Sequence, residues 1–163
     1  MGRVYTLSTL LEEVNRLKAE GKRIVMANGV FDVLHVGHVR YLQAAAQLGD
    51  FLIVAVNSDE STKQLKGEGR PLVPERERAE MVSAIEGVDA VVIFGESTVE
   101  SLLRAIRPHV HAKGTDYTKE TVPERDVAKE LGIEIAIVGD RKDHSVTDIL
   151  NRIAKRITGE GEP

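Results

Sequence analysis

Cysteine and tryptophan are absent from the chain, and long apolar runs are absent as well. Without cysteine there can be no disulfide framework, no thiolate nucleophile and no zinc site with Cys ligands, which fits a reducing compartment. No apolar run reaches the ~18 residues of a membrane span, and Glu12 and Glu13 interrupt the only N-terminal segment that could imitate a signal peptide. We therefore expect a cytoplasmic protein that has no membrane partner.

An excess of positive charge is also lacking. The 22 Lys and Arg residues are outnumbered by 26 Asp and Glu residues, so the formal net charge is -4. Proteins that bind nucleic acid through bulk charge are usually basic, and only three Phe and three Tyr residues could stack on bases. We expect no nucleic-acid partner.

The residues that are present are typical of a globular domain. A chain of 163 residues can bury a sizeable core, and a composition of 42% hydrophobic and 29% charged residues is too apolar for a disordered chain. We expect a single domain over residues 1–163, with its core at 21–157 and a flexible tail at 158–163.

Short apolar segments alternate with helical patterns along the whole chain. The expected strands are 24–27, 51–56, 91–94, 110–112 and 135–138. Each is almost continuously apolar, which is typical of parallel strands covered on both faces. The sequence therefore predicts an α/β, doubly wound and Rossmann-like fold, with a five-stranded parallel sheet and helices on both faces.

Polar residues predict where several helices begin. Three segments match the capping box, a Ser or Thr followed three residues later by Glu, and they begin at Thr9, Ser97 and Thr121. A charged helix is expected from about Pro74, and Ser145 is expected to cap the last helix.

Ligands of doubly wound folds bind beyond the carboxyl ends of the strands, where the strand order reverses. The first expected strand leads there into Asn28-Gly29-Val30-Phe31-Asp32-Val33-Leu34-His35-Val36-Gly37-His38. Two histidines three residues apart lie on one side of the first turn of a helix, and Gly37 between them lets a phosphate approach the backbone. Gly29 serves the same approach at the turn after the strand.

Two alternatives for the histidines stay open. His35 could be a core histidine and His38 a solvated one. A zinc site would need a third ligand, for which His109, His111 and His144 are candidates by residue type alone.

This segment resembles the H-x-G-H signature of the nucleotidyltransferase superfamily, the cytidylyltransferase-like group. The resemblance covers about residues 22–153. It continues through Ala55-Val56-Asn57-Ser58-Asp59, Lys66-Gly67-Glu68-Gly69-Arg70-Pro71, Lys113-Gly114-Thr115-Asp116-Tyr117 and His144-Ser145-Val146-Thr147. The combined pattern is most similar to D-glycero-beta-D-manno-heptose 1-phosphate adenylyltransferases, and next to glycerol-3-phosphate cytidylyltransferases.

The resemblance implies a reaction in which a sugar-phosphate oxygen attacks the α-phosphorus of a nucleoside triphosphate, with ATP favoured, and expels pyrophosphate. Mg²⁺ would be carried with the triphosphate, and a homodimer is expected because related enzymes often pair. His35, His38 and Lys66 would be catalytic by stabilising the charge that develops. Lys66 and Arg78 would also bind the acceptor phosphate. Locally, Lys66 could be a solvated lysine and Arg78 part of a surface ion pair.

A larger set is implied to bind the nucleotide: Asn28, Gly29, Val30, Phe31, Asp32, Gly37, Lys113, Gly114, Asp116, Arg141, Ser145 and Thr147. The segment at Lys113 could instead be a plain turn built on Gly114, and Ser145 could act only as an N-cap.

The chain departs from the family pattern at four positions. Val146 replaces a hydroxyl residue, Thr115 stands where heptose enzymes commonly have a second glycine, and Ala27 stands where a threonine often precedes Asn28. Arg141 is one residue closer to Ser145 than in the glycerol-phosphate enzymes. These departures bear on the identity of the substrate and leave the histidines unchanged.

A non-catalytic nucleotide-binding module is the alternative function, and Val146 is the feature that favours it. An NAD-dependent oxidoreductase is excluded because the first turn lacks G-x-G-x-x-G. A Walker-type kinase is excluded because the chain has no G-x-x-x-x-G-K-[ST] segment.

Overall fold

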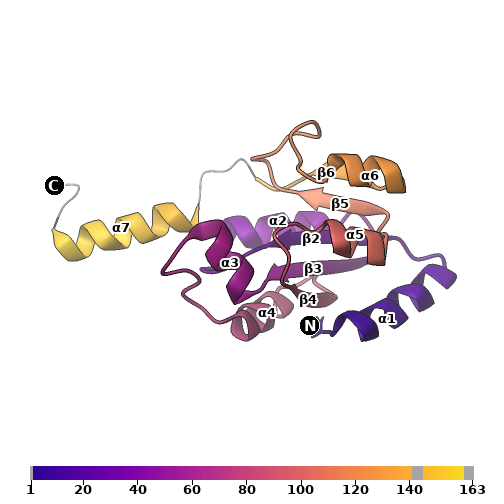
Figure 1. Ribbon diagram of the computed structural model, residues 1–163, viewed down its shortest axis with the longest axis horizontal. Helices are drawn as coiled ribbons and strands as arrows, with labels where there is room; N and C mark the ends of the chain where they lie inside the picture. The colour runs from indigo at the N-terminus through magenta and orange to yellow at the C-terminus, as the bar shows by residue number, and fades with distance from the viewer. Residues whose placement is uncertain (1, 141–144, 160–163) are drawn as a thin grey trace.

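The centre of the molecule is a sheet of six parallel strands in the order β1-β4-β3-β2-β5-β6 (Figure 1). The computed structural model describes residues 2–140 and 145–159. The strands are β1 (Arg3–Val4), β2 (Ile24–Gly29), β3 (Phe51–Asn57), β4 (Ala90–Phe94), β5 (Val110–Lys113) and β6 (Glu134–Ile137). The helices are α1 (Leu7–Ala19), α2 (Val36–Ala46), α3 (Asp59–Lys66), α4 (Glu75–Ser83), α5 (Glu100–Ile106), α6 (Arg125–Leu131) and α7 (Val146–Thr158). The predicted doubly wound α/β fold is confirmed.

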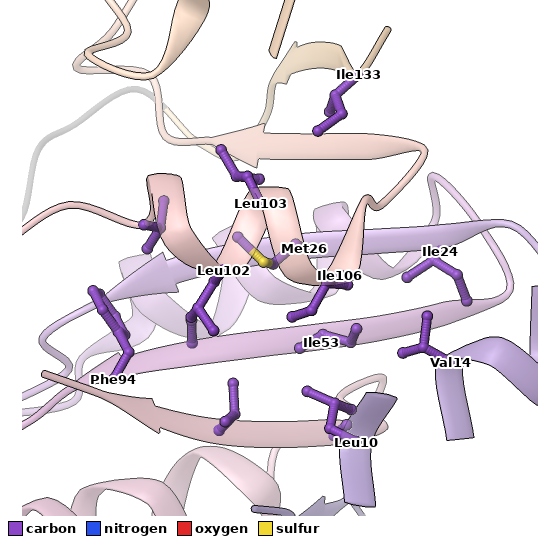
Figure 2. Packing of buried hydrophobic residues seen from close by; sticks show 14 of the residues in the cluster. Leu10, Val14, Ile24, Met26, Ile53, Phe94, Leu102, Leu103, Ile106 and Ile133 are labelled. Atoms are coloured by element: carbon purple, nitrogen blue, oxygen red, sulfur yellow. The ribbon is translucent and has the colours of Figure 1, made fainter. Parts of the chain in front are cut away.

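Side chains of the central strands alternate between two buried clusters, one on each face of the sheet. Ile24 and Met26 of β2 pack with Leu10 of α1 and Leu103 of α5 on one face, as Figure 2 shows. Val25 and its alternate neighbours pack against α2 and α4 on the other face. Burial on both faces explains why the strands are continuously apolar rather than alternating apolar and polar.

The prediction of five strands is wrong by one, because β1 adds a sixth strand beside β4. Both residues of β1 are exposed. It is joined to the sheet by backbone bonds from Arg3 N–H to Asp89 O at 3.1 Å and from Tyr5 N–H to Val91 O at 2.8 Å. A strand of two exposed residues has no apolar pattern, so only its pairing identifies it.

Several helix ends differ from the predicted capping boxes. Thr6, not Thr9, caps α1, since its side chain accepts a bond from the Thr9 N–H. The helices α5 and α6 begin after Val99 and Glu124, and neither of these residues makes a side-chain cap bond. The helix α3 was not predicted, because its only apolar residue is Leu65, which is exposed.

The last helix, α7, begins as predicted and projects away from the sheet (Figure 1). The Ser145 hydroxyl accepts a bond from the Asp148 N–H at 3.0 Å, and none of the residues of α7 is buried. Of the predicted tail, Thr158 belongs to this helix and Gly159 ends it, whereas 160–163 lie outside the described residues. Within the described ranges, no helix is long and apolar enough to cross a bilayer.

The strand order reverses between β2 and β5. The chain passes from β2 through α2 to β3 and through α4 to β4 on one face, and then returns to β5 on the other side of β2 through α5 on the opposite face. The carboxyl ends of β2 and β5 therefore lie next to each other with loops leading away in opposite directions, which is the place where such folds bind ligands.

Candidate active site

A cavity of about 670 Å³ lies at the carboxyl ends of β2 and β5. The loops that follow β2, β4, β5 and β6 contribute to its lining, together with the last residue of β3, the end of α3 and the first turns of α2 and α7. Of the residues proposed from sequence, those that line it are Asn28, Gly29, Val30, Phe31, Asp32, His35, Gly37, His38, Lys66, Lys113, Gly114, Asp116, Ser145 and Thr147.

The two signature histidines are held at the first turn of α2 by its backbone. His35 Nδ1 accepts a bond from the Gly37 N–H at 3.1 Å, and His38 Nδ1 accepts one from the His35 N–H at 3.2 Å. The rings are stacked with their centroids 3.9 Å apart. Because each Nδ1 is an acceptor, each neutral ring has its proton on Nε2 and can donate it to an anion.

The turn before α2 is shaped by Gly29 and Phe31. A Cβ on Gly29 would lie 3.0 Å from the Phe31 ring, so the glycine makes room for that ring. Phe31 is buried, has a φ of 54°, and places its ring centroid 5.4 Å from that of His38. A positive φ is rare for a bulky residue. The turn therefore holds the Phe31 ring next to the His38 ring.

Asp32 holds a loop in place with its carboxylate. It accepts bonds from the Leu72 and Val73 N–H groups, each at 2.9 Å, and from Arg70 Nε at 2.8 Å. Burial alone would raise the pKa of Asp32, but these backbone bonds and the Arg70 guanidinium outweigh it, so the pKa is lowered. Asp32 thus shapes the cavity wall by fixing residues 70–73.

The placement of Arg78 corrects the expectation that it contacts the acceptor phosphate. It is 1% exposed and is not among the residues that line the cavity. Its guanidinium donates to the backbone oxygens of Val73, Val30 and Asn57 and pairs with Asp59 at 2.8 Å. The guanidinium is thus occupied in joining α4 to the ends of β2 and β3. Its ion pair joins a buried guanidinium to the half-exposed Asp59 and is not a pair between two surface residues.

A second charged group lies on the β5 side of the cavity. Lys113 is 6% exposed, and its Nζ lies 4.5 Å from the centroid of the Tyr117 ring. Burial lowers the pKa of Lys113, while Glu124 and Asp116 act in the opposite direction. The Tyr41 hydroxyl donates to Ala112 O at 2.6 Å, which ties α2 to β5.

The remaining predicted residues are distributed around this cavity. Lys66 is the exposed last residue of α3, and Ser145 and Thr147 lie at the start of α7. Thr115, at one of the departures from the family pattern, donates from its hydroxyl to Asp140 O at 2.6 Å and so joins the loops after β5 and β6. Arg141 lies outside the described residues.

Two of the three histidines considered as zinc ligands make hydrogen bonds within the sheet region. His109 Nδ1 accepts a bond from the Ile24 N–H at 2.9 Å, and His111 Nε2 lies 2.9 Å from Asn28 Oδ1. His144 lies outside the described residues. In the part of the chain that the structure describes, no group of three or more His, Asp or Glu residues could hold a metal ion.

Sequence reasoning missed Tyr41 and Glu124, which also line the cavity. Tyr41 follows His38 by three residues, and this spacing on a helix places both on one face. Glu124 matches only a capping box in the sequence, and no local pattern signals that its side chain is buried.

Comparison with known proteins places most of the chain in a family. The model of the cytidylyltransferase-like family matches residues 26–157. The protein called bifunctional protein HldE of Pelobacter propionicus is 48% identical over 139 residues, which are 85% of this chain and 28% of that protein. The HldE protein of Geobacter sulfurreducens is 43% identical over 153 residues, which are 94% of this chain and 31% of that protein.

A solved structure shares the fold. It is the crystal structure of the lipopolysaccharide core biosynthesis protein from Thermoplasma volcanium, with a TM-score of 0.63 and 28% sequence identity, and it covers 75% of this chain and 100% of that one. The chain spans about three tenths of the length of the HldE relatives it matches.

Proposed function

The chain belongs to the cytidylyltransferase-like family, and from this premise we propose that it is a nucleotidyltransferase. It transfers a nucleoside monophosphate, with ATP as the favoured donor, to a sugar phosphate and releases pyrophosphate. The favoured acceptor is heptose 1-phosphate. The observation that carries the proposal is the pair of stacked histidines at the first turn of α2, inside the cavity at the reversal of strand order.

The reaction needs little help from a general base, but it depends on hydrogen-bond donors. An oxygen of the acceptor phosphate, already ionised, attacks the α-phosphorus, and a new O–P bond forms. The bond from the α-phosphorus to the bridging oxygen breaks, and pyrophosphate leaves with the electron pair. Negative charge grows on the oxygens around phosphorus during this exchange, so donors that are already oriented lower the barrier.

Different side chains around the cavity would bind different phosphate groups of the substrates. The Nε2–H groups of His35 and His38 would donate to the phosphate oxygens at the reacting centre, because their Nδ1 atoms are held by the backbone. Lys66 would add a positive charge from the end of α3. Ser145 and Thr147 would bind the outer phosphates at the first turn of α7, where backbone N–H groups and the helix dipole favour anions.

Magnesium enters this proposal as part of the substrate. The described residues contain no carboxylate cluster for a resident ion, whereas triphosphate oxygens are the hard ligands that Mg²⁺ prefers. The ion would arrive bound to the triphosphate and neutralise part of its charge.

Support for a heptose phosphate comes from similarity to relatives. The segments at residues 55–59, 66–71 and 113–117 resemble heptose 1-phosphate enzymes, and the matched solved protein is named for lipopolysaccharide core biosynthesis. The HldE relatives are named bifunctional, and the matched part of each is about three tenths of its length. The proposal therefore concerns nucleotidyl transfer alone and not the second activity that the name of these relatives indicates.

The experiment measures pyrophosphate release from ATP, CTP and GTP, each with Mg²⁺ and a panel of heptose 1-phosphate, glycerol 3-phosphate and other small phosphate esters. We expect release with ATP and the heptose ester, and none when the acceptor is omitted. Release only with CTP and glycerol 3-phosphate would support the same type of reaction with a different donor and acceptor. A folded protein that binds nucleotide in calorimetry but releases no pyrophosphate across the panel would be a binding module, which Val146 in the cavity lining favours.

The homodimer and the cytoplasmic location stay predictions. Light scattering coupled to size-exclusion chromatography would test the first, since a dimer has twice the mass calculated from 163 residues.

A further inference from the structure

The side chain of His111, in β5, makes a hydrogen bond across the point where the strand order reverses. His111 lies beside Met26 in the parallel pair of β2 and β5. Its side chain is therefore on the same face of the sheet as those of Met26 and of Asn28, which is two residues further along β2. The His111 Nε2 atom lies 2.9 Å from Asn28 Oδ1. The proposed reaction gives this histidine no role so far.

Burial decides which nitrogen of the His111 ring has the proton. The residue is 0% exposed, and its Nδ1 has no hydrogen-bond partner among the described residues. Burial also lowers the pKa of His111 to about 3, so the ring is neutral near neutral pH and has a single N–H. A proton on Nδ1 would be a buried donor without an acceptor, which is rarer in native proteins than an unpaired acceptor. The proton therefore lies on Nε2, and His111 donates it to Asn28 Oδ1.

This bond fixes the orientation of the Asn28 amide. An amide side chain has an acceptor at Oδ1 and two N–H donors at Nδ2, and His111 occupies the Oδ1 side. Within residues 2–140 and 145–159, Asn28 Nδ2 donates to no acceptor, and it is not one of the buried atoms that lack a partner. Because Asn28 lines the cavity, its N–H groups are available to a ligand there.

Phosphate is the ligand that matches this orientation. Ionised phosphate oxygens accept hydrogen bonds from N–H groups and are repelled by an amide oxygen. The last torsion of an asparagine side chain has no strong preference of its own, so a free amide can present either end. Asn28 is also close in the chain to the turn that leads to the two signature histidines. A fixed donor at this position favours phosphate binding because no binding energy is needed to orient it.

We propose that His111 is a positioning residue, which holds the Asn28 amide so that its N–H groups face the phosphates of the bound nucleoside triphosphate. This inference rests on the proposed function for the identity of the ligand. His111 itself does not line the cavity, so it acts on the substrate only through Asn28.

A double-mutant cycle, measured by calorimetric binding of Mg-ATP without an acceptor, tests this coupling. His111→Leu removes the donor and keeps a buried side chain of similar size. We expect it to bind Mg-ATP about tenfold more weakly, the scale of a hydrogen bond to a charged group. Asn28→Ala should also lose about tenfold, and the double variant should again lose about tenfold rather than about a hundredfold. The affinity for adenosine, which has no phosphates, should change by less than about twofold in each variant.

Two further variants separate the donor from the rest of the ring. His111→Gln restores an N–H donor, and its affinity for Mg-ATP should be within about threefold of that of the unaltered protein. His109→Leu is the matched control, the same change at an exposed histidine that does not line the cavity. It should alter the affinity by less than about twofold.

Additive losses of about a hundredfold in the double variant, or equal losses of affinity for Mg-ATP and adenosine, would overturn the inference. Nitrogen NMR of the unaltered protein that places the His111 proton on Nδ1 would also overturn it. This last measurement needs no variant, so the test survives if His111→Leu fails to fold. Coupled losses without pyrophosphate release from any acceptor would support the inference and reject the proposed function, whereas pyrophosphate release with additive losses would do the reverse.

Discussion

At the scale of single residues, the important feature of His35 and His38 is the ring nitrogen that each uses to bind the backbone. Both Nδ1 atoms accept backbone N–H groups, so the two Nε2 atoms are the donors that can serve the reaction. A substitution that keeps the acceptor and removes the donor separates the structural role from the catalytic one. Asparagine at residue 38 has this property, because its Oδ1 can accept the His35 N–H.

We predict that His38→Asn lowers kcat for pyrophosphate release by about 10²–10³-fold, the usual effect of losing one donor to a developing oxyanion. The midpoint of urea unfolding should stay close to that of the unaltered protein. His38→Ala should lose both the activity and the bond to the His35 N–H, at a cost of about 1 kcal/mol in stability.

His109→Asn is the matched control, because His109 Nδ1 also accepts a backbone N–H but does not line the cavity. Its kcat should be close to that of the unaltered protein. Turnover by His38→Asn at the unaltered rate would show that the Nε2–H of His38 is not needed.

His111 predicts a dependence of stability on pH. It is fully buried, and burial with a smaller effect of Lys113 lowers its pKa to about 3. The unfolded chain has a histidine pKa of about 6.5, so below that pH the unfolded state binds the proton and the folded state does not. Stability therefore falls as pH decreases below about 6.5, and the loss from His111 reaches about 2 kcal/mol at pH 5.

His111→Gln keeps an N–H donor for Asn28 Oδ1 and removes the titrating group. We expect its free energy of unfolding, measured in urea at pH 7 and pH 5, to decrease by about 2 kcal/mol less than that of the unaltered protein. Burial also lowers the pKa of His109. His109 is present in both proteins, so its effect on the free energy of unfolding cancels in the comparison. Equal losses in the two proteins would place the pH sensitivity elsewhere.

At the scale of elements, the carboxylate of one residue attaches the loop between α3 and α4 to the turn after β2. Asp32, in the turn after β2, accepts from two backbone N–H groups and a guanidinium of this loop. The lowered pKa means that this contribution to stability is complete above the ordinary carboxyl pKa of about 4 and is lost as pH falls through the lower folded value.

We predict that Asp32→Asn lowers the free energy of unfolding at pH 7 by about 3 kcal/mol, because Arg70 loses its charge partner and a backbone donor loses an acceptor. Limited proteolysis should become faster between residues 67 and 73. Asp126→Asn is the control, since that side chain is 94% exposed. A change in unfolding free energy no larger than that of the control would show that the loop is held by other contacts.

At the scale of the whole molecule, the cavity draws on segments that are far apart in the sequence. Residues from β2 to the first turn of α7 line it, and α7 itself buries no side chain against the body. A ligand that contacts all these segments links them in the folded state and has no comparable site in the unfolded chain.

Magnesium-ATP should therefore raise the free energy of unfolding by about 2.7 kcal/mol at a concentration 100 times its Kd. Thermal unfolding followed at rising concentrations measures this shift. Adenosine with Mg²⁺ serves as the control, and we expect a smaller shift because it lacks the phosphates. A midpoint that does not respond to Mg-ATP would contradict nucleotide binding by the folded protein.

The central strands and the histidine motif were predictable because their signals are local. The apolar runs at 24–27 and 51–56 correspond to β2 and β3, which are buried on both faces by helices. The spacing of His35 and His38 also specifies their place at the first turn of a helix. In each case the signal lies within a few residues of sequence. It follows from the regular repeat of side-chain direction along a strand or a helix.

Local patterns also led to errors where two signals compete. Thr9 with Glu12 matches a capping box, yet Thr6 caps α1. The exposed strand β1 and the polar helix α3 have no apolar periodicity of their own, so sequence reasoning could not find them. These elements form because neighbouring segments supply their partners.

The sequence by itself determined the parallel α/β fold, the reversal of strand order as the place to look for a ligand, and the histidine pair. Only the tertiary structure decided which charged side chains face the cavity and which are buried supports. Arg78 is buried and binds backbone oxygens, Asp32 binds a loop, and the Oε2 atom of the buried Glu124 has no hydrogen-bond partner among the described residues. The physical reason is that the role of a charged residue depends on which donors and acceptors surround it, and these come from segments distant in the chain.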